Sequence, residues 1–392
     1  MLSESGISQI KEAIKEGVDQ KFIAGANLLI YKEGKEVFYH EEGYADLNTG
    51  KPIKRDTIFR LYSMSKPVTA AAVMILMERG KIDLYDPVSK YLEGFQNQKV
   101  EQDGKLVAVE REATIRDLLF MTAGLVYGGN DRAGKETEAL FLEINEKLLG
   151  EKPLETVEIM NRLGKCTLSF QPGASWQYGT SADVLGAVVE VVSKKRYGEF
   201  LRDELFLPLG MKDTGFWVTP DKQDRLAVTY EEDKKAGLIP YYGNHLGINN
   251  RMDREPAFES GGAGLVSTVD DYIRFATMLI QRGTYDNFQL LRPKTVEYLT
   301  TGTLNMLQQK NFDLWQNLGY SYGNLMRIMT DTTKAGTLVS AGEYGWDGWL
   351  GPYFSNCPKD KLSYLFMIQK TNAGTTPLTR RLRNIILSSC CD

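Results

Sequence analysis

A serine and a lysine stand three residues apart, at Ser63 and Lys66, near the start of a strongly apolar stretch over residues 59–80. If a helix begins near Ser63, with Pro67 in its first turn, residues at this spacing lie on one face, so the hydroxyl and the amine would meet. A hydroxyl is a poor nucleophile until a base takes its proton, and a lysine held away from water can be that base. The spacing therefore predicts nucleophilic chemistry at Ser63.

This chemistry requires a neutral lysine. Lowering its pKa from about 10.4 to near 7 costs on the order of 4 kcal/mol, which burial and a positioned hydrogen-bond partner must supply. The small and apolar residues from Val68 to Met77 predict a helix that runs through a packed interior. Ser-x-x-Lys also arises by chance, as a serine-rich helix start with a surface lysine. A third polar group is therefore expected beside the pair.

Two later segments offer such groups. Tyr178 follows a Pro172-Gly173 turn and precedes a predicted helix start at Ser181, where a phenol can relay protons. The alternative is an ordinary half-buried aromatic whose hydroxyl is satisfied. Residues 344–354 are rich in glycine at the start of a predicted strand, which allows a ligand to approach the backbone. That strand could supply an amide to an oxyanion.

Composition and charge exclude several classes of function. The chain has 392 residues, of which 42% are hydrophobic and 25% charged, which suits two domains or one domain with a large insertion. The net charge of −4 and the lack of a basic run argue against nucleic acid or acidic lipid as a partner. The sequence contains no run of 18 apolar residues, so no membrane span is predicted. The N-terminal 17 residues read as an amphipathic helix without a leader, so we expect a cytoplasmic protein.

Metal and cofactor sites are not predicted either. The four cysteines form no CxxC pair, the two histidines lie far apart, and neither a GxGxxG nor a GxxxxGK[ST] phosphate loop occurs. We therefore expect no cofactor, no zinc site and scattered reduced thiols. The cysteines and histidines are Cys166, Cys357, Cys390, Cys391, His40 and His245.

The hydrophobic periodicity changes twice along the chain. Residues 25–31 and 36–43 predict a hairpin, residues 84–289 are mostly helical, and strands return at 320–329, 337–343, 349–355 and 362–369 before a helix at 377–387. An isolated hairpin is barely stable, so strands from both chain ends should share one antiparallel sheet. We predict an α+β fold in which residues 1–84 and 290–392 form a sheet domain flanked by helices. Residues 85–289 form a mostly helical inserted domain, with the site at the interface.

Two glycine-rich loops interrupt the helical part, at 124–130 and 259–268, and such loops often line a cleft.

Taken in order, these motifs resemble the serine beta-lactamase-related family over roughly residues 7 to 385. That family comprises class C beta-lactamases, D,D-peptidases, and esterases or acyltransferases of the family VIII type. The segments that carry the resemblance are Gly34, Gly43-Tyr-Ala-Asp46, Ser63-Met-Ser-Lys66, Gly80-Lys-Ile-Asp-Leu84, Asp86-Pro-Val88, Thr114-Ile-Arg-Asp-Leu-Leu119, Gly124-Leu125, Pro172-Gly173 with Tyr178, and Gly261-Gly-Ala-Gly-Leu-Val-Ser-Thr268.

The resemblance implies catalytic roles for three residues: Ser63 as the acylated nucleophile, Lys66 as its base partner and Tyr178 as the proton shuttle. The family's tyrosine-x-asparagine motif reads Tyr178-Gly179-Thr180 here, without the asparagine. Its lysine- or histidine-threonine-glycine strand is replaced by Trp346-Asp347-Gly348, and in beta-lactamases and D,D-peptidases those polar groups grip the substrate amide and carboxylate. A tryptophan there is similar to what esterase-like members carry, so we expect a carboxylesterase acting on small or medium acyl esters.

By the same resemblance, the backbone amides of Ser63 and Trp349 form the oxyanion hole, where each donor is worth about 3 to 4 kcal/mol. Trp346, Asp347 and Gly348 are expected to bind substrate. Tyr127 is a candidate for lining the acyl pocket, or equally a structural aromatic.

Other functions remain open: a beta-lactamase, a D,D-peptidase or D-aminopeptidase, an acyltransferase to an alcohol, or a ligand-binding member without catalysis. An alpha/beta-hydrolase would need a G-x-S-x-G elbow with a histidine, and the chain has no such elbow. His245 is expected in a solvent-exposed loop, although it could touch substrate. The loop over residues 234–254 is predicted to decide the acyl acceptor, and the oligomeric state is left open.

Overall fold

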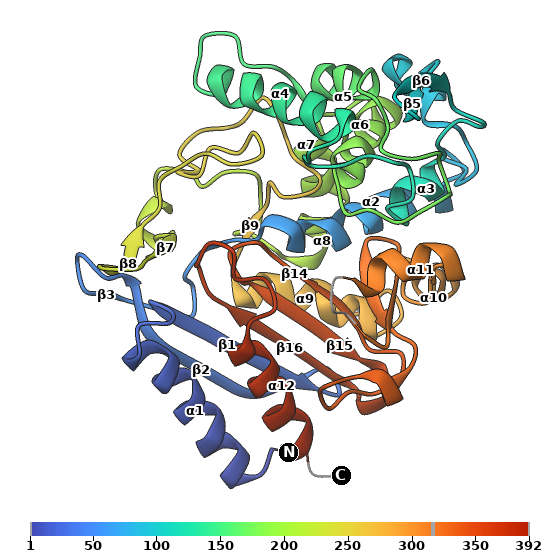
Figure 1. The fold of residues 1–392 in the computed structure, drawn as a ribbon. Coiled ribbons are helices and arrows are strands. Elements are labelled where there is room, and N and C mark those ends of the chain that lie inside the picture. Colours follow the sequence, from blue (N-terminus) through green and yellow to red (C-terminus); the bar gives the residue numbers. More distant parts are fainter. Residues whose placement is uncertain (1, 315–317, 391–392) are drawn as a thin grey trace.

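The computed structural model describes residues 2–314 and 318–390. Its largest element is an eight-stranded antiparallel sheet in the order β12-β13-β14-β15-β16-β1-β2-β3 (Figure 1). The strands are β1 (Gly25–Lys32), β2 (Lys35–Asp46), β3 (Lys51–Pro52), β12 (Tyr320–Gly323), β13 (Met326–Met329), β14 (Tyr344–Asp347), β15 (Tyr353–Cys357) and β16 (Leu362–Met367).

The two ends of the chain meet in the middle of this sheet. β1 pairs with β2 on one side and with β16 on the other, in a register that places Asn27 opposite Met367. Each strand of the N-terminal hairpin therefore gains the neighbours that a lone hairpin lacks. The predicted α+β fold, with one sheet built from both chain ends, is confirmed.

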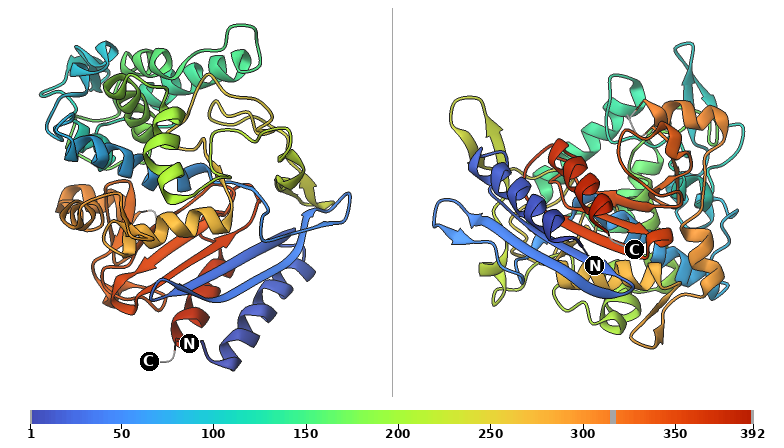
Figure 2. Two further views of the ribbon diagram at one scale, coloured as in Figure 1. Left: turned by 180° about the vertical axis from the view of Figure 1, so that it is seen from behind. Right: turned by 90° about the horizontal axis from the view of Figure 1, so that it is seen from below.

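Helices cover both faces of the sheet. Along β1, Leu28 and Ile30 face α1 (Glu4–Asp19) and α12 (Pro377–Ser389), whereas Leu29 lies in the larger core on the other face. This alternation follows from the period of two in a strand. The other face is covered by α9 (Val269–Ile280), as the views from behind and below show (Figure 2).

The remaining helices lie mostly above the sheet, in the upper part of Figure 1. They are α2 (Lys66–Glu78), α3 (Ile115–Leu119), α4 (Arg132–Lys147), α5 (Thr156–Gly164), α6 (Ser181–Ser193), α7 (Tyr197–Leu201), α8 (Leu207–Leu209), α10 (Pro293–Leu299) and α11 (Met306–Asp313). Short strand pairs accompany them: β4 (Phe59–Arg60) with β9 (Val266–Ser267), β5 (Lys99–Gln102) with β6 (Lys105–Ala108), β7 (Tyr230–Asp233) with β8 (Gly237–Pro240), and β10 (Thr284–Tyr285) with β11 (Phe288–Gln289).

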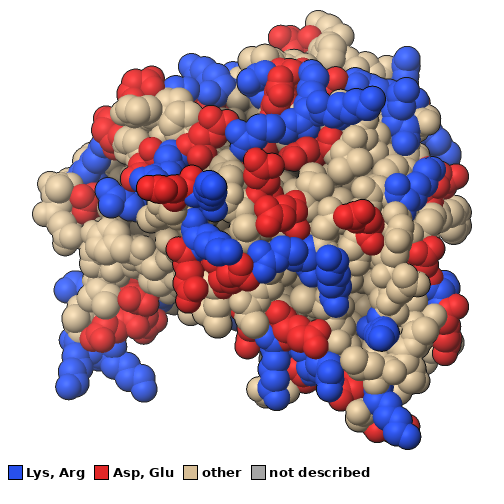
Figure 3. Space-filling view, turned by 90° about the horizontal axis from the view of Figure 1, so that it is seen from above, with Lys and Arg blue, Asp and Glu red and all other residues tan. Residues whose placement is uncertain are grey.

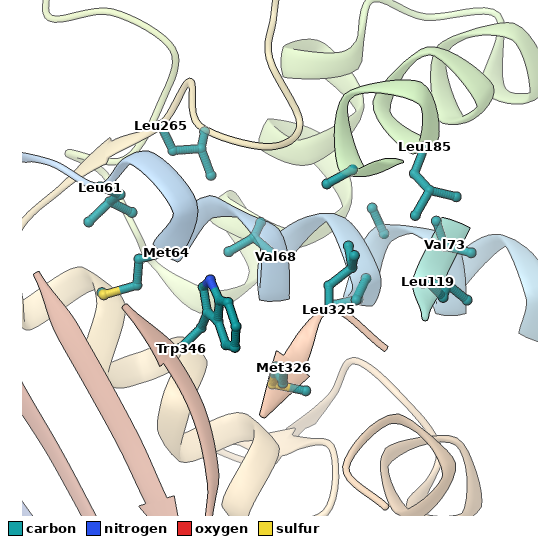
Figure 4. Close-up of a cluster of buried hydrophobic side chains, with 14 of the residues drawn as sticks. Leu61, Met64, Val68, Val73, Leu119, Leu185, Leu265, Leu325, Met326 and Trp346 are labelled. Carbon is teal, nitrogen blue, oxygen red and sulfur yellow. The ribbon is translucent and has the colours of Figure 1, made fainter. Parts of the chain in front are cut away.

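Helix α2 joins the sheet to the helical part. The first eleven of its thirteen residues are all buried, so this part of the helix has no solvent face. In Figure 4, its Val68 and Val73 lie among Leu185 of α6 above and Met326 and Trp346 of the sheet below. The predicted domain boundaries at residues 84 and 289 stay predictions. Helix α9 falls within residues 85–289 and packs on the sheet.

Three of the predicted C-terminal strands were placed wrongly. Residues 320–329 form a hairpin rather than one strand, because Asn324 and Leu325 have φ of 50° and 63° and reverse the chain in a tight turn. Residues 337–343 are irregular. The predicted strand 349–355 begins only at Tyr353, because Gly348 and Gly351 close a turn in which the Gly351 amide donates to the Gly348 carbonyl at 2.8 Å.

Charged side chains of both signs are mixed over the face seen from above (Figure 3). Within the described residues, none of the helices combines the length and the apolar character that crossing a membrane requires.

Candidate active site

Ser63 lies on a tight turn between β4 and α2. Residues Tyr62–Ser65 form one turn of 3₁₀ helix, and α2 begins at Lys66 with Pro67 in its first turn, where a missing amide costs nothing. Tyr62 has φ of 45°, a conformation that strains a bulky residue, and the Leu61 amide anchors the turn on the Leu265 carbonyl at 2.8 Å. This turn presents Ser63 at the surface of a cavity while α2 continues into the core.

The Lys66 amine is buried beneath Ser63 and has three oxygen neighbours. Its Nζ lies 3.0 Å from Ser63 Oγ, 3.0 Å from the Tyr127 hydroxyl and 2.8 Å from the Gly262 carbonyl. A neutral amine has two hydrogens, which suit Gly262 and Tyr127, and one lone pair, which is left for the Ser63 proton. The side chain is 0% exposed, and this burial lowers the pKa of Lys66 to about 7.

Asp183 in the first turn of α6 shapes this environment. Its carboxylate accepts hydrogen bonds from the Ser260 hydroxyl and from the Gly262 amide at 3.0 Å, so it fixes the loop whose carbonyl holds Lys66. Burial raises the pKa of Asp183, and its charge in turn raises the pKa of Lys66 against the larger effect of burial. The glycine-rich pattern at 259–268 had indicated a loop lining a cleft, but nothing in the sequence indicated Asp183.

Tyr178 completes the group around Ser63. Its hydroxyl accepts a hydrogen bond from the Trp346 indole at 3.1 Å, and the Lys66 amine lies 4.6 Å from the centre of its ring. Burial raises the pKa of Tyr178, while hydrogen bonds with Ser63 and Trp346 lower it by less. The structure therefore brings Ser63, Lys66 and Tyr178 together, as the sequence predicted, with a neutral phenol beside the serine.

Tyr127 has a closer relation to Lys66 than the sequence indicated. It lines the cavity, as expected for a pocket residue, and its hydroxyl also holds the Lys66 amine. Its ring packs against Tyr178 with 5.8 Å between centroids. Burial raises the pKa of Tyr127 well above its usual value, so this hydroxyl remains protonated.

The end of β14 is pressed against the Ser63 turn. A side chain at Gly348 would place Cβ 2.0 Å from the Leu61 carbonyl oxygen, so only glycine permits this approach. The next residue, Trp349, lines the same cavity as Ser63. An oxyanion hole formed by the amides of Ser63 and Trp349 needs these two residues close together beside the cavity. The role of the two amides stays a prediction.

The described residues that line the cavity do not include Trp346, Asp347 or Gly348. Trp346 is 4% exposed and packs on Tyr178, and the Asp347 carboxylate accepts from the Thr375 hydroxyl at 2.9 Å. Substrate contact by these three residues remains a prediction.

The cavity above Ser63 has a volume of about 530 Å³, within the usual range for small-molecule sites. It is lined by Tyr62, Ser63, Tyr127, Gly128, Glu138, Phe141, Leu142, Asn145, Tyr178, His245, Leu246 and Trp349. The expectation that His245 is a solvent-exposed loop residue was wrong: its ring packs on Trp349, 4.3 Å between centroids, and lines the cavity. The sequence around His245 indicates a polar loop, but it does not reveal that the His245 ring packs on Trp349.

Within the described chain, no group of three histidine, cysteine or acidic side chains is placed to hold a metal ion.

Comparison with known proteins identifies the class to which this fold and site belong. The sequence profile of the Beta-lactamase family matches residues 10–387, so the chain belongs to this family of serine hydrolases. The resemblance seen in the sequence motifs is thereby confirmed.

Two relatives and one solved structure cover nearly the whole chain. Protein Rv1367c of Mycobacterium tuberculosis is 32% identical over 370 residues, covering 91% of this chain and 88% of its own. Esterase EstB of Burkholderia gladioli is 27% identical over 391 residues, covering 97% and 94%. The structure of EstCE1, described as a hydrolase with promiscuous acyltransferase activity, superposes with a TM-score of 0.83 at 26% identity, covering 98% of each chain.

Proposed function

We propose that this protein is a carboxylesterase that works through an acyl-enzyme on Ser63. The observation that carries the proposal is the 3.0 Å contact between the buried Lys66 amine and Ser63 Oγ, with Tyr178 beside them. An amine with a pKa of about 7 is neutral in about half of the molecules at pH 7, so it is available as a base. The likeness to EstB and EstCE1 supports the same reaction class.

In acylation, Ser63 Oγ bonds to the ester carbonyl carbon while its proton passes to the Lys66 lone pair. The carbonyl oxygen becomes an oxyanion, which the amides of Ser63 and Trp349 stabilise. When the carbon–oxygen bond to the alcohol breaks, Tyr178 donates its proton to the departing alkoxide, and the Lys66 ammonium gives the proton taken from Ser63 to the Tyr178 oxygen. The products of this half-reaction are an alcohol and an acyl group on Ser63.

In deacylation, a water molecule attacks the acyl carbon, and the Lys66–Tyr178 pair takes one of its protons. The second tetrahedral intermediate collapses, the bond to Ser63 Oγ breaks, and the pair returns the proton to that oxygen. A carboxylic acid leaves and the enzyme is restored, so two successive proton transfers use the same two groups.

An ester substrate fits the site better than a lactam or peptide. The strand beside the nucleophile carries Trp346, whose indole donates to Tyr178, where the family's beta-lactamases and peptidases carry polar groups that bind substrate. This indole is occupied with positioning the phenol and is 4% exposed. The indole therefore has no free donor for a hydrogen bond to a substrate carboxylate.

Hydrolysis of p-nitrophenyl butyrate by the pure protein tests the proposal. Wild type should release p-nitrophenol with a burst of acyl-enzyme, whereas Ser63→Ala and Lys66→Ala should lose nearly all turnover and keep a folded circular dichroism spectrum. Equal rates for wild type and Ser63→Ala would overturn it. A chromogenic cephalosporin and a D-alanine p-nitroanilide, assayed alongside, should be turned over far more slowly.

Acyl transfer to an alcohol is a second candidate, because EstCE1 is described as having promiscuous acyltransferase activity. An alcohol would replace water at the acyl carbon. Adding methanol to the assay and measuring methyl butyrate separates this outcome from hydrolysis alone.

We further propose that the protein acts in the cytoplasm on a small molecule. The thiols of Cys166 and Cys357 are not in disulfides, which suits a reducing compartment.

A further inference from the structure

One wall of the cavity above Ser63 is a single face of α4. Glu138, Phe141, Leu142 and Asn145 all line the cavity, and their spacing of three, four and seven residues places them on one side of the helix. This wall carries one carboxylate, two apolar side chains and one amide. The rest of the lining is rich in aromatic rings.

Glu138 is the only carboxylate among the twelve residues that line the cavity, and none of the twelve is a lysine or an arginine. Its Oε1 accepts from the Gly129 amide at 3.1 Å, and among the described residues the ion pairs on this stretch of α4 involve Glu143 instead. The one basic side chain in this lining is His245, and burial lowers its pKa, so it adds no positive charge at neutral pH. Glu138 therefore sets the sign of charge that the lining presents.

The aromatic side of the cavity can also hold a cation. Tyr62 and Trp349 meet edge to face with 5.0 Å between their ring centroids, and His245 packs on the same indole. The faces of such rings attract an ammonium group, most strongly when water is excluded.

We propose that the cavity selects esters that carry an ammonium group away from the scissile bond, over neutral esters of the same shape, and disfavours anionic esters. This inference rests on the proposed esterase function. The carboxylate of Glu138 and the aromatic faces attract the cation, while an anionic substrate meets Glu138 and finds no basic partner in the lining.

Three butyrate esters that differ only at the far end of the alcohol test the selection. They are butyrylcholine, its neutral isostere 3,3-dimethylbutyl butyrate, and the butyrate ester of 2-hydroxyethanesulfonate. We expect wild-type kcat/KM for butyrylcholine to exceed that for the neutral ester by at least about fivefold, with the sulfonate ester slowest. Because Glu138 is exposed at the rim, the preference should shrink when salt is raised from 20 mM to 500 mM.

The matched variants are Glu138→Gln and Glu146→Gln. Both remove one charge from α4, but Glu146 is exposed and lies outside the cavity lining, and glutamine at 138 keeps an oxygen for the Gly129 amide. Glu138→Gln should bring the ratio of the choline ester to the neutral ester towards one, and Glu146→Gln should leave the ratio unchanged.

A wild-type ratio near one, or an equal fall of the ratio in both variants, would overturn the inference and leave the esterase proposal intact. If Ser63→Ala hydrolysed the neutral ester as fast as wild type, the esterase proposal itself would fail.

Discussion

The indole of Trp346 donates a hydrogen bond to the hydroxyl of Tyr178 at 3.1 Å. The same phenol also shares a hydrogen bond with Ser63, so two neighbours fix the position of the hydroxyl. Trp346 is anchored in turn by Tyr322, edge to face with 5.1 Å between centroids. A tryptophan in the strand beside the nucleophile thus orients the phenol that we propose as the proton shuttle.

Tyr178→Phe should lower kcat/KM for p-nitrophenyl butyrate by at least about a hundredfold, because a general acid-base group contributes about 10²- to 10⁴-fold. The ring and its packing on Trp346 and Tyr127 remain, so the melting temperature should change little. Steady-state kinetics and thermal denaturation check both expectations.

Tyr127→Phe is the matched control for Tyr178→Phe. It removes one of the three oxygens around the Lys66 amine, so it should disfavour the ammonium form and shift the pH profile downward, with a loss in kcat/KM below about tenfold. If the two substitutions had equal and small effects, Tyr178 would not be the proton shuttle.

The pH dependence of kcat/KM should report the Lys66 amine. Burial lowers its pKa to about 7, and only the neutral form can accept the Ser63 proton, so kcat/KM should rise with pH and reach half its plateau near pH 7. A profile that is flat from pH 5.5 to 8.5 would show that another group is the base.

Asp183→Asn should move this profile towards lower pH. The carboxylate raises the pKa of Lys66, so its removal lets the amine lose its proton at a lower pH, while asparagine keeps an oxygen for the Ser260 and Gly262 contacts. The half-maximal pH of kcat/KM measures the shift. An unchanged midpoint would mean that Asp183 carries no charge beside Lys66.

Gly348→Ala should reduce kcat by about 10²- to 10³-fold, which is the range for loss of one oxyanion donor. The new Cβ would meet the Leu61 carbonyl at 2.0 Å, so β14 and the Ser63 turn must move apart, and the Trp349 amide moves with β14. Gly336→Ala is the control, because no atom lies within 4 Å of a Cβ there. Full activity of Gly348→Ala in a folded protein would contradict the proposed hole.

Glu343→Gln should destabilise the fold by about 3 to 5 kcal/mol, because it leaves the Arg383 guanidinium buried without its carboxylate. The two groups lie 2.6 Å apart and are 0% and 4% exposed at their side chains, and Glu343 also accepts from Tyr320 and Ser355. Denaturant unfolding measures the loss.

Arg381→Ala, on the same helix α12, should shift the denaturation midpoint little, since its ion pair with Glu16 is exposed. If Arg381→Ala and Glu343→Gln lowered the free energy of unfolding equally, burial of the Glu343–Arg383 ion pair would not explain the effect of Glu343→Gln.

The parts of the site that are close in sequence were predictable, since helical spacing alone brings Lys66 beneath Ser63. Tyr178 was a candidate because of its place before a helix start, and the family resemblance gave it the role of proton shuttle. Asp183 and Glu138 were not predicted, because what matters is the loop or cavity that each faces across the fold. No local pattern in the sequence records such a long-range contact.

The fold shows the same division. The sheet and most helices follow from periodicity, whereas the reversal at Asn324-Leu325 was missed because the apolar pattern continues through the turn. Helices α10 and α11 were also missed. The three-oxygen environment of Lys66 combines residues from α2 and from the loops around residues 127 and 262, which only tertiary packing brings together.

The pairing of β1 with β16 also has a consequence for how the protein is made. Asn27 leaves the ribosome long before its partner Met367, so during translation the β1–β2 hairpin has an open edge where β16 will later bind. Pairing between strands so far apart in sequence closes slowly, and an open edge can bind other chains in the meantime. Nascent chains stalled before β16 should therefore be the species that chaperones capture, because the sheet that supports the Ser63 turn assembles only near the end of synthesis.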